Sequence, residues 1–149
     1  MHAHIGYQVK TLNNMITKKI IAYSSESELD EVTVMHGWIL GYLYDNRDKE
    51  IFQKDIEKEF EINKSTVTCI IKLMEKKGYI QRQSVEYDGR LKRIRLTDKG
   101  EKSHIEALRS IKKVEGILRQ NIPDEELDSF FDTINKLKSN LSKEMVNNA

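Results

Sequence analysis

The segment from Phe52 to Gly100 constrains the fold of this chain more than any other. It contains a short helical pattern over Gln53–Phe60, a tight turn at Glu61–Asn63, and a longer helical pattern that starts at Lys64. A hairpin pattern follows directly. Two helices joined by a short turn and followed by a hairpin are the sequence form of a winged helix-turn-helix.

The second helix of this pair and the hairpin have recognisable boundaries. Gly78 suits the left-handed residue that ends a helix. Strands are predicted over Tyr79–Tyr87 and Lys92–Leu96, around a turn that contains Asp88-Gly89, a dipeptide favoured in hairpins. Thr97 is the expected N-cap of a long fifth helix that runs to about residue 120.

Helical patterns flank this core on both sides. Apolar residues step by three or four over Ile5–Tyr23, and a second helix is predicted over Val34–Tyr44 with Thr33 as its cap. Pro123 marks the start of a sixth helix, a position where proline costs no hydrogen bond. The predicted fold is therefore mostly α with a small β wing.

We expect a single domain over residues 1–149. Residues 33–100 form the winged helix-turn-helix lobe, and residues 1–29 and 101–149 form a helical dimerisation region, because the wide apolar stripe of the sixth helix needs more cover than one small body offers. No run of apolar residues reaches the roughly 18 of a membrane helix. The start of the chain lacks the apolar core of a signal peptide. With a single cysteine, this predicts a cytoplasmic protein that makes no membrane contact.

Charge is distributed unevenly along the chain. Residues 63–102 hold 11 Lys/Arg against 5 Asp/Glu, a local net charge of +6, whereas the whole chain carries only +1. A basic segment in an otherwise acidic chain is typical of a module that binds a polyanion.

Placed on a helical wheel, the helix from Lys64 has two distinct sides. Its apolar side must pack inward. Its polar side combines short side chains, which let the backbone approach base edges, with lysines that meet phosphates. The polar residues are Lys64, Ser65, Thr68 and Lys72, with Cys69 and Lys76 at the edge.

The hairpin places three cations, Arg90, Lys92 and Arg93, beside the predicted turn. An arginine inserted into a narrow minor groove gains from its focused negative potential. An acidic residue, Asp88, is unexpected in a hairpin that binds a polyanion. Its presence is explained if its carboxylate accepts a hydrogen bond from Arg90 and so positions the guanidinium.

Five stretches resemble, in order, the MarR family of bacterial transcriptional regulators: Thr33–Leu40, Gln53–Ile56, Lys64–Thr68, Glu75–Ile80 and Asp88–Gly100. The resemblance covers nearly the whole chain, and the wing stretch is its most specific part. It implies an obligate homodimer, built from the first, fifth and sixth helices, that binds a pseudo-palindromic operator, commonly as a repressor.

Carried onto matching positions, the resemblance implies that Ser65, Thr66 and Thr68 face the major groove and that Arg90 enters the minor groove, steadied by Asp88. It also implies release of DNA by a small aromatic or lipophilic effector. Candidate residues for the effector cleft are Tyr7, Met15, Trp38 and Tyr42, although aromatic residues at helical spacing are more often core residues.

The sequence departs from the family pattern at two positions. Cys69 stands where the family often has arginine, which removes a phosphate contact. Phe52 stands where a small polar residue usually caps the third helix, a cap worth about 1 kcal/mol.

Other functions remain as alternatives. Cys69 lies beside Lys72 near a helix N-terminus, which favours a thiolate and hence a redox-switched regulator. A winged helix can also act as a protein-interaction module, and a regulator with no physiological ligand is a third alternative. His2, His4, His36 and His104 lack the spacing of a metal site, and no nucleophile–base pair or phosphate loop is present. We therefore expect no enzyme, cofactor or metal.

Overall fold

The computed structural model describes residues 3–24 and 31–147, with the side chains of residues 31–33 and 144–147 excepted. His2 and residues 25–29 of the predicted dimerisation region lie outside the described residues. Contacts divide the chain into two compact units, residues 1–114 and 115–149, and each is described by itself. Within the described residues, no helix combines the length and apolar character needed to cross a membrane.

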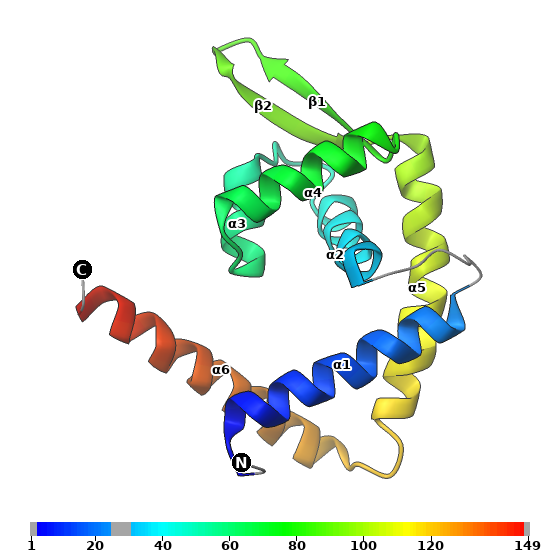
Figure 1. Cartoon of the computed structure of the whole chain (residues 1–149), viewed down its shortest axis with the longest axis vertical. Coiled ribbons are helices and arrows are strands. Elements are labelled where there is room, and N and C mark those ends of the chain that lie inside the picture. Colours follow the sequence, from blue (N-terminus) through cyan, green and yellow to red (C-terminus); the bar gives the residue numbers. More distant parts are fainter. Residues whose placement is uncertain (1–2, 25–30, 148–149) are drawn as a thin grey trace. The chain divides into compact units, whose positions relative to one another are not determined.

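The described residues form six helices and one two-stranded antiparallel sheet, as the sequence predicts (Figure 1). The elements run, in order, α1 (Ile5–Tyr23), α2 (Glu31–Asp45), α3 (Gln53–Phe60), α4 (Lys64–Lys76), β1 (Ile80–Val85), β2 (Asp88–Leu96), α5 (Asp98–Leu118) and α6 (Asp124–Asn147). The predicted bounds of α1 and α3 are confirmed, and Gly78 adopts a left-handed φ of 77° just after α4.

Two boundaries differ from the sequence-based prediction. Helix α2 is already formed at Glu31, so Thr33 lies inside the helix and is not its N-cap. The hairpin turn falls at Glu86-Tyr87, because Val85 pairs with Asp88 across it. Gly89 is therefore part of β2 and does not take the left-handed φ that an Asp-Gly turn requires.

The core of the first unit lies between α2, α3, α4 and the sheet. Its buried side chains come from every one of these elements, so the short α3 and the wing are both anchored in one cluster. The cluster comprises Ile39, Leu40, Leu43, Ile51, Ile56, Val67, Ile70, Ile71, Met74, Ile80 and Ile94. The Ile94 N–H also donates to the Ile51 carbonyl (2.7 Å), which fastens β2 to the segment before α3.

Helix α5 packs against α2 through buried polar residues. His104 stacks on Tyr44 with 4.9 Å between ring centroids and lies over Gly41. Burial lowers the pKa of His104, because charging the imidazole there would remove it from water. Ser110 donates to the carbonyl of Tyr23 (3.1 Å) and so joins α5 to the end of α1.

The start of α5 is joined to the end of α4 by Thr97. Its hydroxyl donates to the Gly78 carbonyl (2.6 Å) and accepts from the Gly100 N–H (3.1 Å), which confirms the predicted N-cap. A Cβ at Gly100 would overlap the main-chain carbonyl of Tyr79. Only glycine therefore fits where these two chain segments cross.

We predict that Gly100→Ala lowers the free energy of unfolding by at least about 2 kcal/mol, since main-chain atoms must move to admit the methyl group. Gly116→Ala is the matched control on the same helix, because a Cβ at Gly116 meets nothing within 4 Å. It should raise helix stability by about 0.5 to 1 kcal/mol. Urea denaturation followed by circular dichroism measures both, and equal effects would contradict the close approach at Gly100.

Candidate nucleic-acid interface

Helix α4 presents one polar face to solvent because its other face is buried. Val67, Ile71 and Met74 are fully covered by the core. The Asn63 side chain caps the helix by accepting from the Thr66 N–H (2.9 Å). The exposed residues of α4 are Lys64, Ser65, Thr66, Cys69, Lys72 and Lys76, and Thr68 is half-buried among them. The structure thus places all the predicted recognition residues on or beside one surface, which we call the α4 face.

Asn63 was not singled out from the sequence, although asparagine before an apolar-periodic run is a normal cap signal. Its carboxamide oxygen also accepts from the Ser65 hydroxyl (2.7 Å). The cap therefore both starts α4 and orients one of the predicted recognition side chains.

Gln53, at the start of α3, is bonded to the α4 face. Its amide nitrogen donates to the Thr68 hydroxyl oxygen (2.8 Å) and to the Glu57 carboxylate (3.0 Å). Thr68 in turn donates its hydroxyl proton to the Lys64 carbonyl (2.8 Å). No sequence pattern reveals this network, since its members lie up to 15 residues apart.

The departure at Phe52 is partly compensated. Phe52 has no side-chain acceptor to cap α3, but the Asp55 carboxylate accepts from the Phe52 N–H (2.8 Å). This is the reciprocal half of a capping box, and a carboxylate in the first turn also interacts favourably with the helix dipole.

Asp88 acts differently from the expectation. Its carboxylate accepts from the main-chain N–H of Arg90 (2.9 Å), so it shapes the wing tip and does not hold the guanidinium. Within the described residues, the Arg90 side chain has no hydrogen-bond or ion-pair partner. Residues 89–91 also stand outside the paired register of the two strands, which leaves Arg90 exposed at the end of the wing.

The cations of the wing fall into two groups. Arg82 is bound to Glu75 of α4 (2.7 Å), and this hydrogen bond lowers the pKa of the Glu75 carboxyl. Arg93 forms a longer ion pair, with 3.5 Å between its guanidinium nitrogen and the Glu50 carboxylate oxygen. Arg90, Lys92 and Arg95 are exposed and, in the described part of the chain, form no ion pair.

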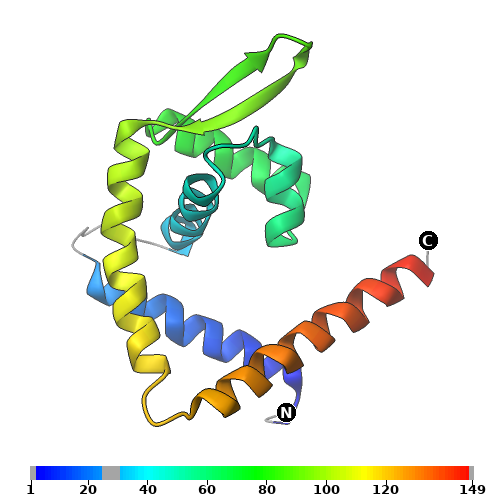
Figure 2. The ribbon, with the colours of Figure 1, turned by 180° about the vertical axis from the view of Figure 1, so that it is seen from behind.

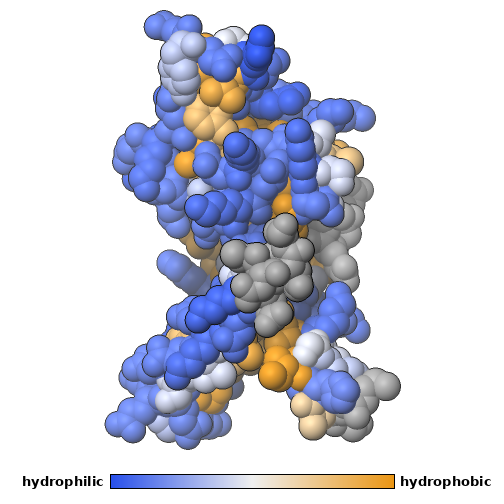
Figure 3. All heavy atoms as spheres, turned by 90° about the vertical axis from the view of Figure 1, so that its left-hand side faces the viewer, coloured by the Kyte–Doolittle hydropathy of each residue, from blue (hydrophilic) through white to orange (hydrophobic). Residues whose placement is uncertain are grey.

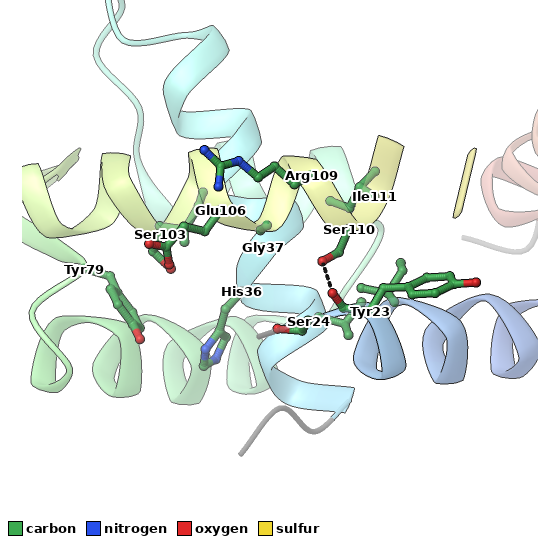
Figure 4. Close-up of a pocket in the computed structure, with 14 residues that line it drawn as sticks. Tyr23, Ser24, His36, Gly37, Tyr79, Ser103, Glu106, Arg109, Ser110 and Ile111 are labelled. Atoms are coloured by element: carbon green, nitrogen blue, oxygen red, sulfur yellow. Dashed lines mark hydrogen bonds between the residues drawn. The ribbon is translucent and has the colours of Figure 1, made fainter. Parts of the chain in front are cut away.

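A cavity of about 300 Å³ lies between α1, α2 and α5 in the first unit. His36 of α2 and Tyr79, which follows α4, both line this cavity (Figure 4). Ser103, Glu106 and Ser110 of α5 line the opposite wall. This volume is at the lower end of the range for small-molecule sites.

None of the four residues predicted for an effector cleft lines this cavity. Tyr42 packs edge-on against Phe60 of α3, with ring centroids 5.9 Å apart. Tyr7 and Met15 of α1 and Trp38 of α2 are exposed. The sequence does not predict which residues line the cavity, because serine, histidine and glycine in a helix give no pattern that indicates a pocket.

A family model described as the MarR family matches residues 31–91, which span α2, α3, α4 and most of the wing. An uncharacterised helix-turn-helix transcriptional regulator of Bacillus subtilis (strain 168), YdgJ, is 29% identical over 94% of this chain and 80% of its own length. The chain is therefore similar to MarR-family regulators, most clearly over the helix-turn-helix and the wing.

Solved structures agree in fold. The S. aureus regulator MepR, solved as a DNA complex, superposes with a TM-score of 0.82 at 23% identity, over 92% of this chain and 98% of that one. The Streptomyces coelicolor regulator PcaV, solved with its natural ligand, gives a TM-score of 0.78 at 18% identity, over 93% and 94%. The chain therefore has the winged-helix fold of these proteins.

Proposed function

We propose that the protein is a homodimeric, sequence-specific regulator of transcription that grips duplex DNA with the α4 face and the wing. One observation carries the proposal: α4 and β2 together present six exposed lysines and arginines whose side chains form no hydrogen bond or ion pair within the described residues. They are Lys64, Lys72 and Lys76 of α4 and Arg90, Lys92 and Arg95 of β2. The wing end of the molecule is mainly hydrophilic in Figure 3.

The geometry suits a duplex. A helix with short polar side chains enters the major groove, and lysines on its edges meet the phosphates. A wing with an exposed arginine at its tip reaches the adjacent minor groove, where negative potential is focused. The likeness to MepR, solved bound to DNA, supports this arrangement.

Arg90→Ala should weaken binding to the operator at least tenfold, because it removes an unpaired cation from the minor groove, while the oligomeric state stays unchanged. Arg119→Ala removes the same charge from a surface ion pair with Glu115 (2.8 Å) and serves as the matched control. Fluorescence anisotropy over a salt series measures both. The slope of log affinity against log salt should become shallower for Arg90→Ala only, and unchanged operator affinity would sink the wing assignment.

Dimerisation is supported by apolar side chains that are exposed in each of the two units, within the described residues. No described side chain of the 24-residue α6 is buried, and Phe130 and Phe131 are 47% and 45% exposed. On α1, Ile5, Val9, Leu12 and Met15 are exposed in one stripe. Exposed apolar surface on a helix marks a protein–protein interface, and we assign both the α1 stripe and the α6 surface to contact with a second copy of this chain.

Phe131→Asp should convert the dimer into a monomer, since each interface would then bury an unpaired carboxylate on both sides. Asp132→Asn, at the neighbouring exposed position, is the control that should remain dimeric. Sedimentation equilibrium decides between the two states. A Phe131→Asp protein that stays dimeric would show that α6 does not form the interface.

We further propose that the regulator acts as a repressor and that a small aromatic or lipophilic effector, bound in the cavity between α1, α2 and α5, releases it from DNA. The cavity is connected to the α4 face through Tyr79. Its side chain lines the cavity, while its N–H donates to the Met74 carbonyl near the end of α4 (3.0 Å). PcaV, solved with its natural ligand, shows that a protein of this fold can bind a small molecule.

Ser103→Phe should fill the cavity and abolish effector release while operator affinity without effector stays within about twofold. The assay first screens small aromatic acids and neutral aromatics for release of the wild-type protein, and then repeats the active compound on the variant. Ser129→Phe, on the exposed surface of α6, controls for the added ring. If Ser103→Phe responds as the wild type does, the effector binds elsewhere.

A further inference from the structure

We propose that Thr68 reads thymine in the major groove through its methyl group, with its hydroxyl turned into the protein. The inference rests on the proposed function, because it assigns what one position of the α4 face recognises. It follows from the hydrogen bonds that already occupy the Thr68 hydroxyl.

A threonine hydroxyl has one proton to donate and two lone pairs that accept. The Thr68 proton goes to the Lys64 carbonyl (2.8 Å), and one lone pair takes the Gln53 amide proton (2.8 Å). The hydroxyl is therefore held by two partners from two helices, α3 and α4.

The orientation of the Gln53 amide is itself determined. The Glu57 carboxylate can only accept, so the amide nitrogen of Gln53 must be the atom that faces it at 3.0 Å. The same nitrogen lies 2.8 Å from the Thr68 oxygen. Gln53 is thus a donor to Thr68, and Thr68 cannot use its proton in that direction.

The groups of Thr68 that can still contact DNA follow from the donors and acceptors on the base edges. Guanine O6 and N7, adenine N7 and thymine O4 are all acceptors, and Thr68 has no proton left to give them. Two groups of Thr68 remain: one lone pair, which could accept from adenine N6 or cytosine N4, and the Cγ2 methyl, whose partner in the major groove is the C5 methyl of thymine. We assign the contact to the methyl because Lys64 and Gln53 already hold the hydroxyl within the protein. Thr66 differs, since its exposed hydroxyl forms no hydrogen bond within the described residues.

The test starts from an operator selected from random duplexes with the full-length protein. Each thymine is then replaced by uracil, which lacks only the C5 methyl, and affinities are measured for the wild type, Thr68→Val and Thr68→Ser. Removing one buried methyl from a contact should cost roughly fourfold per half-site, from about 0.8 kcal/mol per methyl-sized group. Thermal melting confirms that each variant is folded.

We expect one thymine per half-site whose replacement weakens the wild type and Thr68→Val about equally. Thr68→Ser, which keeps the hydroxyl but lacks the methyl, should bind the thymine and uracil duplexes alike. Thr66→Ser, which loses a methyl two residues away, should keep the wild-type sensitivity.

Two results would overturn the inference: no thymine whose uracil sensitivity depends on Thr68, or a Thr68→Val protein that loses the operator more than tenfold, which would make the hydroxyl the reading group. If the selection yields no preferred duplex at all, the proposed function fails and not this assignment.

Discussion

A single hydroxyl group, that of Thr97, holds together the three elements on which the rest of the structure depends. It donates to the Gly78 carbonyl, lies 3.1 Å from the Tyr79 carbonyl, and accepts from the Gly100 N–H. The end of α4, the start of the wing and the start of α5 therefore meet at one point. This meeting is possible only because Gly100 has no side chain and Gly78 accepts a left-handed φ. The relative placement of the α4 face and the wing, which a duplex must match, is set there.

The same junction links the DNA-binding surfaces to the cavity. Tyr79 lines the cavity with its side chain, and its main chain bonds to Met74 of α4 on one side and Thr97 on the other. Displacement of Tyr79 from the cavity would thus pull on backbone hydrogen-bonded to α4 and to the cap of α5, the elements that Figure 2 shows meeting at one end of the hairpin. In a packed interior such a shift is transmitted and not absorbed, because there are few voids to take it up.

The sequence predicted the helices and the winged-helix order well, since the 3.6-residue apolar repeat and the caps at Thr97 and Pro123 are local signals. The sequence-based prediction was wrong or silent where contacts between residues distant in sequence determine the local structure. Asp88-Gly89 has strong hairpin chemistry, yet the pairing of Val85 with Asp88 moves the turn to Glu86-Tyr87. The wheel identified the solvent-exposed polar side of α4, but it could not reveal the contacts that restrict these side chains. Gln53 bonds to Thr68 across a helix boundary, and the cavity forms from residues that are unremarkable in sequence.

These contacts imply a division of roles between affinity and specificity. Among the wing and α4 cations, those tied to Glu75 and Glu50 brace the hairpin against the rest of the lobe, whereas the unpaired ones are free to neutralise phosphates. Phosphate contacts position a protein on DNA without reading sequence. In the proposed complex, base reading is assigned to the short side chains of α4, where Ser65 and Thr68 already donate their protons to Asn63 and Lys64. A recognition surface with so few free donors discriminates bases mainly by fit and by apolar contact. The placement of α4 relative to the duplex therefore matters more for base discrimination than the hydrogen-bonding capacity of its side chains. The junction at Thr97 fixes that placement relative to the wing.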